Sequence, residues 1–315
     1  MRVLVTGGCG FIGANLCHYL VSRGISKLCV RVLDDLSEGR EEYLGVDENG
    51  FEIIRGDVRD THVTMDAVRN VDAVVHLAAK TSVVDSTLQP EETYEVNAAG
   101  TLRLLEACRS HGVKRFVFAS SNAVLGEQAP PAHEQLVPEP ISPYGASKLA
   151  GEALCRAYSA TFGLQTVVLR FANVYGPLSG HKTSVVARFV RQILRGETLT
   201  VYGDGRQIRD FVHVDDVCQA IERALQWEPA SHVSPVFQIG SGMGTSICEL
   251  IEILSALAEA QLGVRPDVTY APPRTGEILE NYSCIDRARR LLGYSPRVAL
   301  ADGLASLWFS HARES

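Results

Sequence analysis

Residues 7–13 read Gly7-Gly8-Cys9-Gly10-Phe11-Ile12-Gly13, and the interpretation of the whole chain starts from this glycine-rich stretch. It follows the apolar run Val3-Leu4-Val5, which predicts a short buried strand, and it leads into apolar residues at helical spacing. Glycines between a strand and a helix let the backbone approach a ligand. The free N–H groups and the dipole at the helix start then favour an anion such as a pyrophosphate. A tight turn that binds nothing is the alternative at this point.

Length and composition limit the kind of protein. The chain has 315 residues, 46% of them hydrophobic, and a net charge of −7. We expect one large domain or two closely joined domains. The negative charge and the lack of a Lys/Arg run argue against nucleic acid and an anionic membrane as partners. Met1 leads directly into a strand and no apolar run is long enough to span a membrane, so we expect a cytoplasmic protein.

The eight cysteines and nine histidines are dispersed along the chain. There is no C-x-x-C pair, no H-x-x-x-H pair and no mixed Cys/His cluster. We therefore expect reduced thiols in place of a disulfide framework, and no metal site.

Apolar runs of strand length alternate with helical patterns through the first half of the chain. The predicted strands are Val3–Thr6, Cys29–Leu33, Phe51–Arg55, Ala73–Leu77, Arg115–Ala119 and Thr166–Arg170. The predicted helices are Phe11–Arg23, Tyr94–His111 and Tyr144–Phe162. Continuous apolar strands with intervening helices predict a parallel sheet covered on both faces. This order fits an α/β fold of the Rossmann type, a doubly wound parallel sheet that binds a dinucleotide.

Two acidic residues support a dinucleotide. Asp34 follows a strand about 20 residues after the glycines, where a carboxylate would bind the ribose hydroxyls of an adenosine. Asp57, in Gly56-Asp57-Val58, closes the next strand, where it could meet the adenine. A carboxylate at position 34 favours NAD over NADP, because it would face the 2′-phosphate with no obvious arginine nearby. The alternative for Asp34 is a turn residue.

The pattern changes after Asn173. Pro and Gly become frequent, and the strand-like pieces Leu199–Tyr202, Val236–Ile239 and Val268–Tyr270 are isolated. We expect residues 1–173 to form the dinucleotide-binding domain, with residues 206–230 returning to it. Residues 174–315 would form a smaller, interleaved α/β lobe over the carboxyl edge of the sheet, where such folds bind ligands.

The stretch Ser142-Pro143-Tyr144-Gly145-Ala146-Ser147-Lys148 carries the chemistry. Tyr144 and Lys148 are four residues apart, so they share one face of a helix. An ammonium beside a phenol, with a nicotinamide cation nearby, is expected to lower the tyrosine pKa towards neutrality. Tyr144 could then act as a general base on a sugar hydroxyl, which its ordinary pKa of about 10 would not permit. The alternative is an ordinary surface pair.

Further motifs appear in order along the chain, and together they resemble the extended short-chain dehydrogenase/reductase family. They are GxxGxxG, HLAA at His76–Ala79, Asn97, Ser120-Ser121, YxxxK and Arg170-Phe-Ala-Asn-Val-Tyr-Gly-Pro177. Within this family the chain resembles the NAD-dependent nucleotide-sugar epimerases and dehydratases, and most closely the UDP-glucose 4-epimerases. The resemblance runs from Met1 to Leu307.

The resemblance implies a tightly held NAD that is consumed and regenerated in each turnover. Tyr144 would take the O4 proton of a UDP-sugar while C4 gives its hydride to the nicotinamide. Ser121 would hydrogen-bond O4, and the hydride would return to the other face of the 4-keto sugar. Lys148 would hold the nicotinamide ribose and tune Tyr144. Ser121, Tyr144 and Lys148 are therefore the expected catalytic residues, although Ser121 could simply cap a strand end.

The resemblance also implies two sets of binding residues, and it places Asn97 beside the catalytic lysine, which it helps to order. The expected cofactor-binding residues are Gly7, Gly10, Phe11, Ile12, Gly13, Asp34, Asp35, Leu36, Ser37, Gly39, Asp57, Val58, Leu77, Ala78, Ala79, Lys80, Asn97, Ala119, Ser120, Tyr144, Lys148, Phe171 and Val174. The expected substrate-binding residues are Ser82, Ser121, Asn122, Ala123, Tyr144, Asn173, Val185, Val201, Tyr202, Arg209, Arg274, Glu277 and Asn281.

In relatives, residues at these second-lobe positions bind different parts of the nucleotide. Arg209 and Arg274 match arginines on the diphosphate, and their forked donors suit that task. Glu277 matches an acid on the uridine ribose, and the strand of Val201-Tyr202 matches one along the uracil. Asn281 matches the residue that lines the sugar pocket, where a bulky aromatic excludes N-acetyl groups. The alternatives are an Arg209-Asp210 ion pair and an Asn281 that points outward.

Several positions depart from the family pattern. Asn122 and Ala123 stand where the dehydratases carry an Asp-Glu pair. Without those carboxyl groups the elimination of water lacks its acid and base, which speaks against 4,6-dehydration. Leu125 replaces a tyrosine, and Asp35 replaces an asparagine. Lys80 replaces a glutamine, and it is either a pyrophosphate or substrate contact or a solvated lysine.

We therefore expect an NAD-dependent isomerase that interconverts C4 epimers of a UDP-hexose: UDP-glucose and UDP-galactose, or an N-acetyl or uronic analogue. One alternative is a reductase or dehydratase of the same family. Another is a regulatory module that binds NAD without turnover, against which Ser121, Tyr144 and Lys148 argue. The resemblance alone favours a homodimer through the helices 94–111 and 144–162. The sequence leaves the sugar open.

Overall fold

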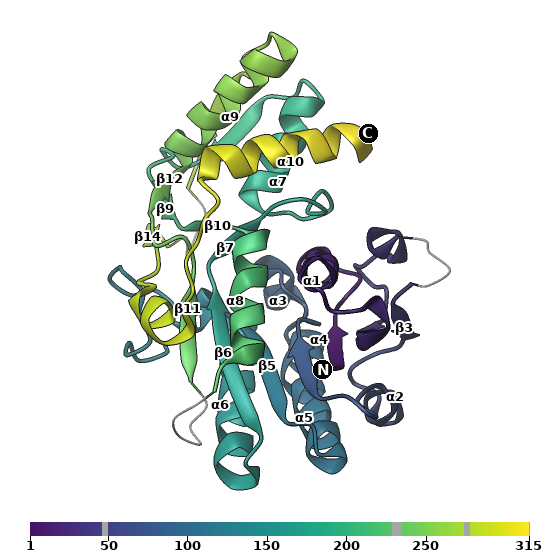
Figure 1. Cartoon of the computed structure of the whole chain (residues 1–315). Coiled ribbons are helices and arrows are strands. Elements are labelled where there is room, and N and C mark those ends of the chain that lie inside the picture. Colours follow the sequence, from purple (N-terminus) through teal and green to yellow (C-terminus); the bar gives the residue numbers. More distant parts are fainter. Residues whose placement is uncertain (46–49, 229–234, 274–277, 315) are drawn as a thin grey trace.

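The computed structural model describes residues 1–45, 50–228, 235–273 and 278–314, and its main element is a seven-stranded parallel sheet (Figure 1). The strand order is β11-β6-β5-β4-β1-β2-β3. The strands are β1 (Val3–Thr6), β2 (Val30–Asp34), β3 (Glu52–Arg55), β4 (Ala73–His76), β5 (Arg115–Ser121), β6 (Gln165–Phe171) and β11 (Val236–Ile239). The chain runs outward from β1 to β3 and then crosses to β4 on the other side of β1. This reversal makes the doubly wound fold, and it places the switch point for a ligand between β1 and β4.

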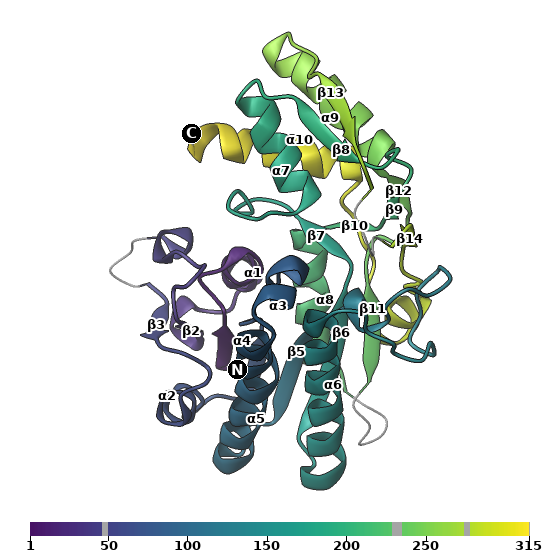
Figure 2. The same cartoon turned by 180° about the vertical axis from the view of Figure 1, so that it is seen from behind.

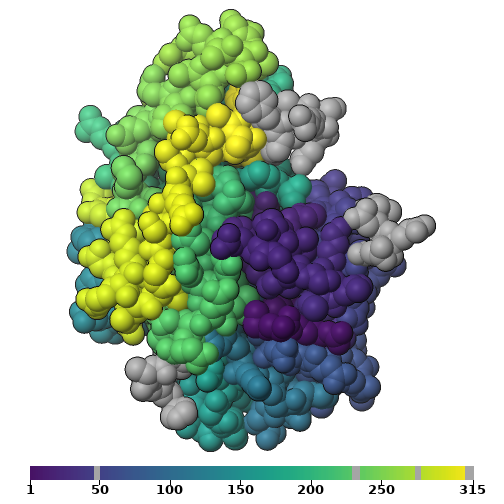
Figure 3. All heavy atoms as spheres, viewed as in Figure 1, coloured from purple at the N-terminus to yellow at the C-terminus, as the bar shows by residue number. Residues whose placement is uncertain are grey.

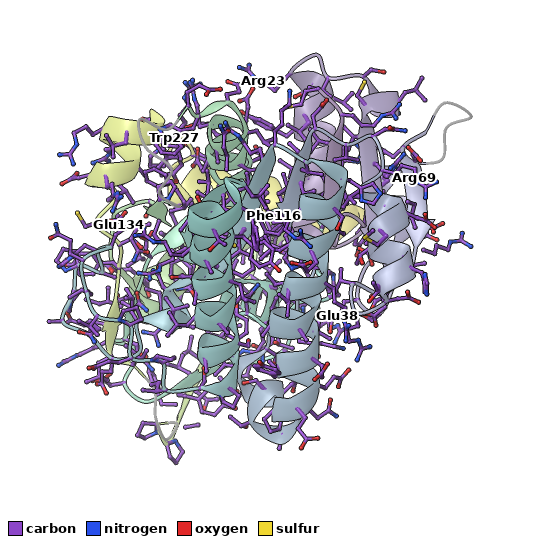
Figure 4. The ribbon with its side chains drawn as sticks, turned by 90° about the horizontal axis from the view of Figure 1, so that it is seen from below. Arg23, Glu38, Arg69, Phe116, Glu134 and Trp227 are labelled. Carbon is purple, nitrogen blue, oxygen red and sulfur yellow. The ribbon has the colours of Figure 1, made fainter. Side chains whose placement is uncertain are left out.

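Helices cover both faces of this sheet. One face carries α1 (Phe11–Ser22) and α8 (Val214–Gln226), which lie side by side in Figure 1. The other carries α2 (Thr61–Ala67), α5 (Gly100–His111) and α6 (Pro143–Phe162), seen in Figure 2. The core clusters divide in the same way, because alternate strand residues face opposite layers. Phe116 of β5 lies at the centre of the α5 and α6 layer (Figure 4).

Shorter helical segments join these elements. They are η1 (Lys27–Cys29), η2 (Glu41–Leu44), α3 (Val83–Leu88), α4 (Pro90–Tyr94), the π-helical turn η3 (Glu95–Ala99), η4 (Asn122–Val124) and the π-helical turn η5 (Ala288–Leu292).

A second lobe lies over the carboxyl ends of the strands. Its helices are α7 (Val185–Leu194), α9 (Ile247–Leu262) and α10 (Leu300–Glu314), which share a third core cluster with β8 (Leu199–Tyr202). Its small sheets are β13 (Val268–Ala271) with β8, β10 (Phe211–His213) with β7 (Asn173–Tyr175), and β12 (Thr245–Ser246)-β9 (Ile208–Arg209)-β14 (Glu280–Asn281). In Figure 3 the carboxyl-terminal residues, in yellow, cover part of both lobes on this face.

The predicted Rossmann-type fold is confirmed, and the predicted strands of the first half and the helices Phe11–Arg23 and Tyr144–Phe162 are present with ends shifted by a residue or two. The predicted helix Tyr94–His111 is divided, because the π-helical turn Glu95–Ala99 separates α4 from α5, which begins at Gly100. The prediction for Val236–Ile239 was wrong. This segment is not an isolated piece of the second lobe, because β11 pairs in parallel with β6 in the large sheet. The pieces Leu199–Tyr202 and Val268–Tyr270 are not isolated either, since they pair as β8 and β13.

Residues near the end of the chain also return to the first lobe. Ile285, Ala288, Leu292 and Tyr294 belong to the core cluster beneath α1 and α8, and the Tyr294 hydroxyl donates to Gly240 O at 2.7 Å. The first lobe therefore includes more of the second half of the chain than the expected residues 206–230. Within the described ranges, no helix combines the length and the apolarity that a membrane crossing needs.

Candidate active site

The glycine-rich turn is packed so closely that its glycines are needed. A Cβ on Gly7, whose φ is +68°, would lie 2.7 Å from Ala78 N, and a Cβ on Gly13 would lie 2.1 Å from Gly7 O. The turn is held by Gly7 N, which donates to Leu33 O at 2.8 Å. Helix α1 begins directly after Gly10, which has no side chain to cap it. Its first N–H groups are therefore available to an anionic ligand.

Asp34 closes β2 beside this turn. Its carboxylate is buried and accepts from Cys9 N and Leu36 N, both at 2.9 Å. Burial raises the pKa of Asp34, and the two N–H bonds oppose that shift. The carboxylate is thus fixed against the glycine turn, at the carboxyl edge of the sheet where a ribose was expected.

The neighbouring acids have local partners. Asp35 accepts from the backbone N–H and the hydroxyl of Ser37, at 3.0 and 2.7 Å. Asp57 is paired with Arg59 at 2.5 Å, and the hydrogen bonds from this guanidinium lower the pKa of Asp57. The expected adenine contact of Asp57 stays a prediction, and any ligand there would meet the Asp57–Arg59 pair.

A buried chain of hydrogen bonds joins β1, β4 and α5. Thr101 Oγ1 donates to Asn97 O at 2.6 Å, so it accepts from His76 Nε2 at 2.9 Å. His76 Nδ1 then accepts from Thr6 Oγ1 at 2.7 Å. Burial lowers the pKa of His76 to about 3, so the ring is neutral. His76 is a structural link at the end of β4.

Asn97 sits in the π-helical turn and connects three segments. Its Oδ1 accepts from Lys80 N at 2.8 Å, and its Nδ2 donates to Lys80 O and to Ser147 Oγ, both at 2.9 Å. Ser147 precedes Lys148, so Asn97 holds the loop after β4 against the helix that carries the lysine. π-Helical turns are frequent at functional sites. The Lys80 ammonium lies 3.6 Å from Glu92.

The three expected catalytic residues come together where β5 ends and α6 begins. Ser142 caps α6 by accepting from Gly145 N at 3.1 Å, and a Cβ on Gly145 would lie 2.4 Å from Ala123 O. This close contact sets the buried Tyr144 beside Ser121, whose hydroxyl is hydrogen-bonded to the phenol. One turn later Lys148 Nζ donates to Ala119 O at 2.9 Å.

The expected effect of Lys148 on Tyr144 is not found. Burial raises the pKa of Tyr144, and the hydrogen bond from Ser121 opposes the shift. Burial also lowers the pKa of Lys148 to about 8. The reason is that both side chains are withdrawn from water, which disfavours the phenolate and the ammonium alike.

Asn122 and Asn281 meet where the two lobes touch. The buried Asn122 donates from Nδ2 to Ser283 Oγ at 3.0 Å and reaches Asn281 Oδ1 at 3.5 Å. Its Oδ1 has no hydrogen-bond partner among the described residues. Asn281 therefore faces the residue that follows Ser121 and does not point outward.

The other second-lobe residues that were expected to bind substrate differ from one another in burial and in their contacts. Val201 is only 1% exposed and its side chain packs in the lobe core, so the expected contact of this strand with a uracil stays a prediction for its backbone and for Tyr202. Alternation along β8 turns Thr200 and Tyr202 to the opposite face. Arg209 donates to Ile208 O at 2.9 Å. Arg274 and Glu277 lie outside the described residues.

The Asp210 carboxylate is bound by second-lobe groups. It accepts from the backbone N–H and hydroxyl of Ser241, at 2.7 and 2.6 Å, and from Gly242 N and Ser283 N. Asp210 is thus a structural anchor of the loops that carry Ser241 and Ser283.

Sequence reasoning missed Thr101 and Glu152. Each lies four residues after a residue that was singled out, Asn97 and Lys148 respectively, and helical spacing from those residues was the signal that could have found them. The site is not the large hollow of about 500 Å³ that is lined by Met1, Asp72, Lys114 and Gln165 among others. That hollow lies at the amino ends of the strands, away from every expected site residue.

Comparison with known proteins agrees with this geometry. Residues 3–240 match the NAD dependent epimerase/dehydratase family. The UDP-glucose 4-epimerase of Mycolicibacterium smegmatis is 39% identical over 312 residues, which are 97% of this chain and 96% of that protein. The structure of UDP-glucose 4-epimerase from Thermotoga maritima with UDP-glucose has a TM-score of 0.90 and 34% identity, covering 100% of this chain and 99% of that chain.

A second solved structure is as similar in fold. The UDP-N-acetylglucosamine 4-epimerase from Methanobrevibacter ruminantium, in complex with UDP-N-acetylmuramic acid, has a TM-score of 0.92 and 30% identity. It covers 100% of this chain and 99% of that chain. The likeness thus spans both lobes.

We expect the purified protein to release NAD, and little NADP, when it is denatured. The reason is that a 2′-phosphate would meet the buried Asp34 carboxylate, whose oxygens already accept from Cys9 and Leu36. Cycling assays specific for each nucleotide measure the released cofactor. Asp34→Asn keeps the shape without the charge and should bind NADP better than the parent does. A predominance of NADP in the parent protein would contradict this reading of Asp34.

Proposed function

The chain belongs to the NAD-dependent epimerase/dehydratase family, and on that premise we propose that it is an isomerase that interconverts the C4 epimers of a UDP-hexose. The observation that carries this proposal is the meeting of Ser121, Tyr144 and Lys148 at the carboxyl edge of the sheet. This edge is also where the glycine turn and Asp34 lie. A group that removes a hydroxyl proton therefore stands next to a dinucleotide site.

The residues around the glycine turn fit NAD. Gly7 and Gly13 leave a backbone cradle that a Cβ would fill, and the start of α1 offers N–H groups to the pyrophosphate. Asp34 is fixed in place for the adenosine ribose. When bound, NAD supplies the acceptor and the donor of the hydride at C4. The chain itself has to bind and orient the sugar and to move the proton of its 4-hydroxyl.

Tyr144 is the proposed base. Its burial holds the phenol protonated, so it needs nearby positive charge to act as a phenolate. Lys148, one helical turn away on the same face, supplies such a charge while its ammonium is protonated. The Ser121 hydroxyl, already bonded to the phenol, is placed to bridge Tyr144 and the sugar O4.

Asn122 and Ala123 disfavour dehydration, the other reaction in the family name. An amide and a methyl group do not titrate, so neither can move the protons that loss of water across C5 and C6 requires. Asn122 is also committed to Ser283 by its hydrogen bond. Epimerisation needs no acid or base at these two positions.

The pairing of Asn122 with Asn281 bears on the sugar. Two amides, one with a buried acceptor that has no partner in the described part of the chain, form a polar and rather small wall at the lobe boundary. We propose that this wall accepts a polar substituent, so that UDP-N-acetylglucosamine is used alongside UDP-glucose.

We also propose that the chain forms a homodimer through α5 and α6. The two helices lie side by side on the face seen in Figure 2. Leu102 of α5 is 39% exposed, and Phe162 at the end of α6 is exposed as well. Exposed apolar side chains of this kind are covered when a second copy packs against the helix pair.

Incubation with UDP-glucose, UDP-N-acetylglucosamine and UDP-glucuronate, followed by proton NMR of the products, tests the proposed reaction. Tyr144→Phe should leave folding and NAD binding nearly intact and lower turnover by about 10²–10⁴-fold, the usual contribution of a general base. Activity above about a tenth of the parent would show that Tyr144 is not the base. Failure of the parent to change any C4 configuration would overturn the proposed function.

Asn281→Tyr should narrow the sugar pocket selectively. A bulky ring beside Asn122 would clash with an N-acetyl group, so the ratio of kcat/KM for UDP-N-acetylglucosamine to that for UDP-glucose should fall roughly tenfold or more. Both substrates are measured on both proteins. Asn281→Gln, which keeps the amide, is the matched control. An unchanged ratio in the tyrosine variant means that position 281 does not guard the pocket.

Leu102→Asp should convert the dimer to a monomer, since it buries a charge in the proposed interface. Sedimentation velocity at several concentrations gives the mass. Met243→Asp, at an exposed apolar position in the second lobe, is the control and should leave the mass unchanged. A parent protein that sediments as a monomer would contradict the interface.

A further inference from the structure

A buried ion pair lies directly behind the catalytic residues. Arg170 of β6 donates from Nε and Nη2 to the two carboxylate oxygens of Glu152 of α6, at 2.8 and 2.7 Å. The side chains of Arg170 and Glu152 are only 4% and 7% exposed. Ser120 of β5 donates to the same carboxylate at 2.5 Å. One charged group thus connects the helix with two strands of the sheet.

Stability alone gives little reason for this pair. Two buried charges lose their hydration, and an apolar pair of similar volume often stabilises a protein as well or better. The pair is not even fully satisfied, because Arg170 Nη1 is buried with no partner among the described residues. Its place relative to the catalytic residues offers a better explanation.

Three residues of α6 at successive helical turns fasten the last three residues of β5. Tyr144 bonds Ser121, Lys148 bonds Ala119 O, and Glu152 accepts from Ser120 Oγ. The spacing i, i+4, i+8 keeps these three side chains on one face of the helix. Glu152 therefore makes the third contact between α6 and the end of β5. The first two contacts are made by Tyr144 and Lys148, the proposed catalytic residues of this helix.

Glu152 is also the carboxylate that acts on Lys148. The ammonium is 4% exposed, lies over the Phe118 ring of β5 and is bonded to a neutral carbonyl. Of the titratable groups around it, His76 of β4 is neutral and Cys155 of α6 has a raised pKa that keeps it a thiol. Tyr144 of α6 is a protonated phenol. Arg170 of β6 has the same sign as the lysine and is held against Glu152.

We propose that Glu152 is a positioning residue of the active site, which holds the end of β5 through Ser120 and supplies the buried negative charge that keeps Lys148 protonated. This inference rests on the proposed function, because it assigns a role in the same reaction. Consistent with it, burial lowers the pKa of Lys148 and both Cys155 and Glu152 oppose that shift, but Glu152 is the one of the two that is ionised, because the pKa of the Cys155 thiol is itself raised. Its two parts, geometry and charge, can be separated by substitution.

Glu152→Gln keeps the shape and an acceptor for Ser120 but removes the charge. Without that charge the pKa of Lys148 falls further, so its ammonium is lost at lower pH. The alkaline fall of kcat/KM should then move down by about one pH unit. Ser120→Ala is the matched control, since it removes the link to β5 and keeps the charge. It should lower kcat several-fold and leave the alkaline fall where it is in the parent.

Both variants are measured as NAD-containing enzyme, after thermal unfolding and cofactor content show that they are folded. If Glu152→Gln does not fold, the double variant Glu152→Met with Arg170→Met replaces the ion pair by an apolar pair. In this double variant the alkaline fall of kcat/KM should still move to lower pH, because Glu152 is the member of the pair that acts on Lys148. An alkaline fall that stays in place in the folded glutamine variant, or in the double variant, overturns the inference. A parent with no epimerase activity would refute the proposed function instead.

Discussion

The contact between the backbone of the glycine turn and its surroundings is the constraint on which the site depends. Gly13 can approach Gly7 O, and Gly7 can approach Ala78, only because neither has a side chain. This approach brings the start of α1 to the point between β1 and β4 where the strand order reverses. The dinucleotide site lies at this point. The hydrogen bond between His76 and Thr101 and the bond from Lys80 N to Asn97 fix the segments that surround it.

The second half of the site depends on a different contact, between α6 and the end of β5. Gly145 packs on Ala123 O, and Tyr144, Lys148 and Glu152 hold Ser121, Ala119 and Ser120. The phenol and the ammonium are both buried there, which disfavours their charged forms. In the proposed reaction, a charge on either group would have to be stabilised by neighbouring side chains and not by water, and Glu152 is a buried carboxylate in position to do this for Lys148.

Local patterns in the sequence were sufficient to predict the strands of the sheet that lie in the first half of the chain, the glycine turn and the shared helix face of Tyr144 and Lys148. They failed where the answer depends on distant segments or on burial. The run Val236–Ile239 is apolar in either lobe, so its pairing with β6 could not be read from it. Val201 and Tyr202 alternate, but which of them faces the core depends on α7 and α9. The pKa of Tyr144 depends on the depth of the site, which spacing does not reveal.

The lobes are interwoven along the chain. Helix α8 and strand β11 join the first lobe between elements of the second, and the residues around η5 join it after α9, β13 and β14. Neither lobe can finish folding as a nascent chain before the other is largely synthesised. No single cut in the gene separates a cofactor-binding half from a sugar-binding half. Relatives with this architecture therefore cannot exchange an intact half by one recombination event. The proposed polar wall of Asn122 and Asn281 lies at the boundary between the lobes, where a point substitution changes it without any exchange of halves.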